Sequence, residues 1–72
     1  MYWTYAATES KVTFHAHTTR DSAELHYHNM RTYGGPRRIG FCRRKMLQPE
    51  IERYATDYFS GLQVSFIEFG KA

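Results

Sequence analysis

Residues 2–17, with the sequence YWTYAATESKVTFHAH, predict the β-hairpin on which the rest of the fold depends. Both halves are rich in aromatic and β-branched residues, and the second half alternates between apolar and polar side chains, which is typical of strands. A two-residue turn at residues 9–10 would place Tyr5 opposite Phe14. In that register the apolar side chains share one face, namely Trp3, Tyr5, Ala7, Val12, Phe14 and Ala16. We therefore expect this face to form the centre of the core.

Residues 21–33 fit either a third strand or a helix. As a helix the segment has Asp21 as an N-cap and Gly34 as a stop. As a strand it would follow a turn at residues 21–22 and add Leu25 and Tyr27 to the core face. The strand is favoured because the interior residues His26, Tyr27, His28, Asn29 and Thr32 are weak helix formers. The strand would also place His15, His17, His26 and His28 together on the opposite face of the sheet.

The remaining segments predict a strand, a helix and a last strand. Residues 37–44 alternate like a short strand, and residues 62–69 predict a final one. Between them, Pro49 opens a helix that Gly61 ends. Its apolar stripe is formed by Ile51, Tyr54, Ala55, Tyr58 and Phe59. The fold class is therefore α+β, a single domain over residues 1–72. It has a mostly antiparallel sheet of four or five strands with this helix on one face, and a second helix if residues 21–33 coil.

The composition excludes several classes of protein. The chain has 72 residues, of which 42% are hydrophobic and 17% aromatic, and this is enough apolar surface to form a core without cross-links such as disulfide bonds. Its one cysteine, Cys42, excludes an internal disulfide framework and a cysteine-based zinc site. There is no apolar run long enough to span a membrane and no signal-peptide pattern at residues 1–5. We therefore expect a cytoplasmic protein that does not bind membranes, while its oligomeric state stays open.

The positive charge is concentrated in one part of the sequence. The net charge is only +3, but residues 25–49 contain no acid. The candidate binding residues are the bases of this window and one tyrosine, namely Arg31, Arg37, Arg38, Arg43, Arg44, Lys45 and Tyr33. On a strand, Arg38, Gly40, Cys42 and Arg44 would share one face, which we expect to be exposed to solvent. Arginine suits planar recognition of phosphate, so the window predicts contact with nucleic acid, a nucleoprotein or an acidic protein surface.

These features favour a small non-enzymatic binding module that engages nucleic acid or a nucleic-acid-handling complex. One alternative is a stoichiometric protein inhibitor or adaptor of the phage or mobile-element type, with arginine and tyrosine as interface anchors. Another is a metal-independent ribonuclease toxin, since His, Tyr and Arg supply a base, an acid and a phosphate clamp. The sequence holds no ordered catalytic motif, so no catalytic residue is assigned.

The histidines and the cysteine raise two further possibilities. Four clustered imidazoles could hold a metal ion, but no carboxylate partner is evident, so we expect neither a metal nor another cofactor. Clustered imidazoles should instead lower one another's proton affinity. Cys42 is flanked by Gly40 and by Arg43 and Arg44, and nearby arginines favour a lowered thiol pKa; a small residue packed in a sheet is the more common situation, and we favour it.

Overall fold

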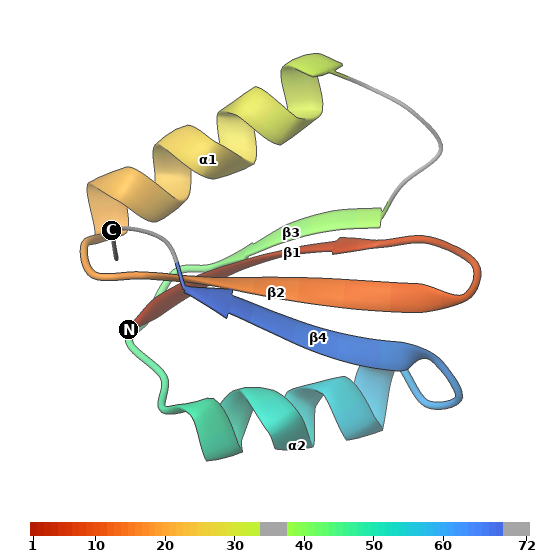
Figure 1. The fold of residues 1–72 in the computed structure, drawn as a ribbon. Helices are drawn as coiled ribbons and strands as arrows, with labels where there is room; N and C mark the ends of the chain where they lie inside the picture. The colour runs from red at the N-terminus through yellow and green to blue at the C-terminus, as the bar shows by residue number, and fades with distance from the viewer. Residues whose placement is uncertain (34–37, 69–72) are drawn as a thin grey trace.

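The protein folds into one four-stranded sheet with a helix on each face, as seen in the computed structural model, which describes residues 1–33 and 38–68 (Figure 1). In chain order the elements are β1 (Tyr2–Ala7), β2 (Lys11–His17), α1 (Arg20–Tyr33), β3 (Arg38–Cys42), α2 (Gln48–Tyr58) and β4 (Gln63–Glu68). The strand order is β3-β1-β2-β4. Strand β1 is antiparallel to β2 and β3, whereas β2 and β4 are parallel. The predicted α+β class is confirmed.

The predicted hairpin forms in the predicted register. Tyr5 pairs with Phe14, and the six apolar side chains of the hairpin share the face that α2 covers. Ile51, Ala55 and Phe59, spaced four residues apart on α2 and the residue after it, are buried against this face. The main hydrophobic core therefore lies between the sheet and α2.

Helix α2 begins and ends close to the predicted residues. Pro49 lies in its first turn, and the Leu47 backbone N–H donates to Glu50 Oε1 at 3.3 Å. Gly61 follows with a φ of +86°, a conformation that favours glycine. The prediction that Tyr58 belongs to the core is wrong, because its side chain is 65% exposed. It lies on the flank of the helix, beside Tyr54, rather than on the stripe that faces the sheet.

The preferred strand at residues 21–33 is wrong, and the alternative second helix is what forms. The helix is capped at Thr19, whose Oγ1 accepts a hydrogen bond from the Ser22 backbone N–H at 3.1 Å. Ala23 is fully buried, and His26 and Tyr27 are half-buried one turn further along. Helix propensity is a weak tendency, and here the contacts of this periodic face with the sheet outweigh it.

The expected solvent face of β3 is also wrong. Gly40 and Cys42 point toward the core, and a Cβ on Gly40 would collide with the Tyr5 ring. The gap at Gly40 is thus filled by an aromatic side chain. Because a helix covers each face of the sheet, β3 is exposed along its outer edge and through the bases at its two ends.

Candidate functional site

The basic residues after β3 point to opposite sides of the sheet. Arg43 lines a hollow beside α1, and Arg44 lines another beside α2. The segment that carries them is anchored at Met46, whose carbonyl accepts a hydrogen bond from the buried Trp3 indole at 2.8 Å. The Met46 N–H also donates to the Met1 carbonyl at 2.8 Å. These two hydrogen bonds hold the backbone that follows Arg43 and Arg44 against the start of β1.

The first hollow, which we call the arginine hollow, combines positive charge with aromatic walls. Its volume is about 240 Å³. The Arg31 guanidinium lies 5.7 Å from the centroid of the Tyr27 ring, and that ring lies 6.1 Å from the ring of Phe41. The lining consists of Arg20, Glu24, Tyr27, His28, Arg31, Phe41 and Arg43. Three guanidinium groups and one carboxylate leave the hollow with a net positive charge.

The arginine hollow unites two predicted residues with one that was missed. Arg31 and Arg43 are distant in sequence, and α1 brings them to the same hollow. Arg20 was missed because it precedes the acid-free window. The signal for it is the spacing of Arg20, Tyr27 and Arg31, which share a face only when the segment is a helix.

The other predicted binding residues lie elsewhere. The Arg38 guanidinium lies 4.9 Å from the centroid of the Phe59 ring, on the α2 side. Lys45 is exposed between the two arginines and the start of α2. Arg37 lies outside the described residues, as does the side chain of Tyr33, the last residue of α1.

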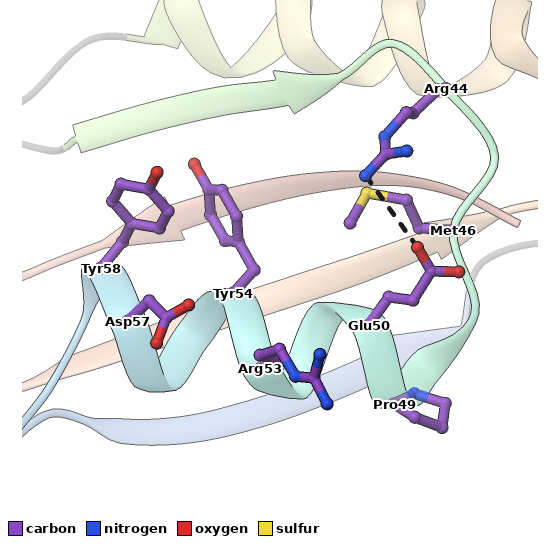
Figure 2. A pocket seen from close by; sticks show the side chains of 8 residues that line it. All are labelled: Arg44, Met46, Pro49, Glu50, Arg53, Tyr54, Asp57 and Tyr58. Carbon is purple, nitrogen blue, oxygen red and sulfur yellow. Dashed lines mark ion pairs between the residues drawn. The ribbon is translucent and has the colours of Figure 1, made fainter.

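The second hollow, which we call the tyrosine hollow, has a volume of about 370 Å³ (Figure 2). Its lining residues are Arg44, Met46, Pro49, Glu50, Arg53, Tyr54, Asp57 and Tyr58. Arg44 Nη2 lies 4.0 Å from Glu50 Oε2. The rings of Tyr54 and Tyr58 are 4.5 Å apart and tilted by 35°. Burial, followed by the contact with Tyr5, raises the pKa of Tyr54, so its hydroxyl stays protonated at neutral pH.

Three of the four histidines form a layer between the sheet and α1. The ring of His26 on α1 lies 4.6 Å from the ring of His15 and 5.1 Å from that of His17, both on β2. Thr4 Oγ1 is within hydrogen-bonding distance of His26 Nδ1 (2.8 Å) and His17 Nε2 (3.2 Å). His17 Nδ1 is also 3.1 Å from the Ser22 hydroxyl. We call His15, His17 and His26 the histidine layer.

The predicted face of four histidines is therefore wrong in its geometry. His28 points away from the layer, with its side chain 61% exposed and its Nε2 4.0 Å from Glu24 Oε1. Burial, together with the charge of His26, lowers the pKa of His15 to about 4. Burial also lowers the pKa of His17 and of His26. The layer is accordingly neutral at pH 7.

Three other properties of the described residues concern metal binding, the Cys42 thiol and membranes. Within residues 1–33 and 38–68, the side chains of His, Cys, Asp and Glu form no group of three or more that could hold a metal ion. Burial raises the pKa of the Cys42 thiol despite the opposing effect of Arg44, which agrees with the favoured interpretation of a small residue packed in the sheet. Neither α1 nor α2 is long and apolar enough to cross a membrane.

The chain matches no protein-family model, and no significant match exists among curated proteins or solved structures.

Proposed function

We propose that this protein is a non-enzymatic module that binds nucleic acid, with the arginine hollow as its main phosphate site. The observation that carries the proposal is that Arg20, Arg31 and Arg43 line one hollow, in which the Arg31 guanidinium lies against the Tyr27 ring. Guanidinium groups bind phosphate oxygens in a planar, two-pronged geometry. A hollow with this charge favours an anion, and its aromatic walls suit the sugar and base that accompany a phosphate.

Exposed bases continue from this site around the end of β3, from the α1 side to the α2 side of the sheet. Arg44 and Lys45 follow Arg43 directly in the chain, and all three are exposed. A single small anion would occupy one hollow, whereas a chain of phosphates would contact several such bases in succession. This arrangement favours a polyanion as the ligand. A cytoplasmic location, where Cys42 stays reduced, is consistent with this role.

The proposal is tested by binding of a fluorescently labelled oligonucleotide over a range of salt concentrations. For a single strand, the log-log slope of affinity against salt should be roughly −0.7 per phosphate contacted. Arg43→Gln should weaken binding and reduce the slope by roughly 0.7, the value for one contact. Lys11→Gln is the matched control. Lys11 is also an exposed base, but it lies at the start of β2, where it pairs with Gln63 of β4 and not with β3. The absence of binding to single- and double-stranded DNA and RNA at low salt would refute the proposal.

A second candidate is the protein inhibitor or adaptor, favoured by a different observation. Strand β4 has no described partner on its outer side, and its side chains Val64 and Ile67 are 37% and 48% exposed. Exposed apolar side chains on an open strand edge suit pairing with a partner protein. A pull-down from cell extract with and without nuclease separates the two functions. One protein partner retained after nuclease favours the inhibitor, and complete loss favours nucleic acid.

A further inference from the structure

The tyrosine hollow differs from the arginine hollow in its charge. Arg44 and Arg53 are balanced there by Glu50 and Asp57, and Arg44 lies 4.0 Å from Glu50 (Figure 2). Such a hollow has no surplus of positive charge with which to attract phosphate. It offers hydrogen-bond donors and acceptors side by side, which suits a neutral ligand with polar edges.

One wall of this hollow is an exposed aromatic ring with a rigid support. Tyr58 is 65% exposed, and its ring rests against that of Tyr54 at 4.5 Å. Tyr54 in turn packs against the rings of Tyr5 and Phe14, at 6.1 and 6.4 Å. Both tyrosines project from α2 toward β3 (Figure 2). Tyr58 therefore presents one face of a well-supported aromatic ring to solvent. The volume of the tyrosine hollow, about 370 Å³, falls within the range of roughly 300–1,000 Å³ typical of small-ligand sites.

A third hollow at the end of β3 adjoins both of the others. This hollow, of about 440 Å³, shares Phe41 and Arg43 with the arginine hollow. It also shares Arg44, Met46 and Tyr54 with the tyrosine hollow. The third hollow therefore lies next to both, on the route that a ligand with phosphate in the first hollow would take to reach the second.

We infer that the tyrosine hollow binds an unpaired nucleobase of the strand whose phosphates lie in the arginine hollow. This inference rests on the proposed function and adds the substrate class, single-stranded nucleic acid. The base would stack on Tyr58, since every base has a π-face. Its amino groups would donate to the carboxylates of Glu50 or Asp57, and its ring nitrogens and carbonyls would accept from the guanidinium groups. A paired base in a duplex presents neither its face nor its full edge, so a duplex cannot fill this hollow.

The experiment compares two oligonucleotides of equal length, one intact and one abasic, both single-stranded. Tyr58→Ala should weaken binding of the intact strand by roughly 5- to 150-fold, the range for loss of one base–aromatic stack. It should leave the abasic strand unaffected. Tyr58→Phe should keep the affinity for the intact strand, because it retains the ring. Leu25→Ala, which removes a similarly exposed apolar side chain from α1, is the matched control.

A second measurement follows the site directly. Tyr58→Trp should show fluorescence quenching on addition of the intact strand and none with the abasic strand, while the buried Trp3 gives the constant background.

The outcomes separate this inference from the proposed function. If Tyr58→Ala leaves the intact strand unaffected, or weakens both strands equally, the nucleobase site is refuted. In either case, weaker oligonucleotide binding by Arg43→Gln would still support the phosphate site. If neither strand binds at low salt, the proposed function and the inference both fall. A further outcome is that Tyr58→Ala abolishes saturable binding to a purified partner protein but leaves the affinity for the intact strand unchanged. That outcome would assign the hollow to a side chain of the partner protein and would refute the nucleobase site.

Discussion

The histidine layer makes the stability of this protein depend on pH in a way that can be calculated. His15, His17 and His26 are packed together, and each has a lowered pKa, so the native state resists taking up protons that the unfolded chain accepts. Between pH 6.5 and 4 the unfolded chain therefore binds more protons than the native one. The free energy of unfolding should be at its full value above pH 6.5 and fall as the solution is acidified.

The magnitude can be worked out for His15, whose pKa is about 4 against an ordinary value of 6.5. One pKa unit corresponds to about 1.4 kcal/mol, so acidification from pH 6.5 to about 5 would remove about 2 kcal/mol. Because His15 is only half-buried, screening by solvent reduces this to about 1 kcal/mol. His17 and His26 add to the loss in the same direction.

The assay is urea denaturation at about pH 7.5 and about pH 5. His15→Phe keeps a ring against His26 but removes the titrating group, so the loss between the two pH values should shrink by about 1 kcal/mol. His28→Phe is the matched control, because His28 lies outside the layer, and it should keep the full loss. An equal loss of stability on acidification in wild type and His15→Phe, or a gain of stability in wild type, would refute this prediction.

Three further predictions concern packing and the thiol. Gly40→Ala should destabilise the protein by about 1–3 kcal/mol, because the new methyl group meets the Tyr5 ring, and Tyr5→Leu should relieve part of this loss in the double variant; additive urea midpoints would contradict it. Ile51→Ala should cost about 2–5 kcal/mol in the same assay, whereas Leu25→Ala should stay within about 0.5 kcal/mol, and equal losses would place the core elsewhere. Cys42 should react with a thiol reagent more slowly in the native protein than in urea at mildly alkaline pH, since burial raises its pKa; equal rates would be inconsistent with a packed thiol.

The hairpin and α2 were predictable from sequence because each depends on local signals. The alternation of residues 12–16 fixes which face is buried, and the pairing of Tyr5 with Phe14 follows from the turn. Pro49 and Gly61 mark the ends of α2 in the same way. These signals lie within a few residues of the structure that they specify.

Helix α1 could not be predicted with the same success, since its own residues are weak helix formers. Its position depends on partners distant in sequence, such as Thr4 for His26 and Phe41 for Tyr27. This error also affected the candidate site. With residues 21–33 as a strand, nothing in the sequence placed Arg20 on the same face as Arg31. The predicted solvent face of β3 failed for a related reason, because pattern alone did not show that a helix covers each face.

The central claim is that phosphate binds in the hollow that Arg20, Arg31 and Arg43 line, and NMR titration of the labelled protein tests it most directly. A single-stranded oligonucleotide is added at low salt, and shifts of backbone amide and arginine side-chain signals are mapped on the structure. We expect the largest shifts at Arg20, Arg31, Phe41 and Arg43, beginning at the lowest oligonucleotide concentrations. Shifts confined to the outer edge of β4, or the absence of shifts at saturating concentration, would contradict it.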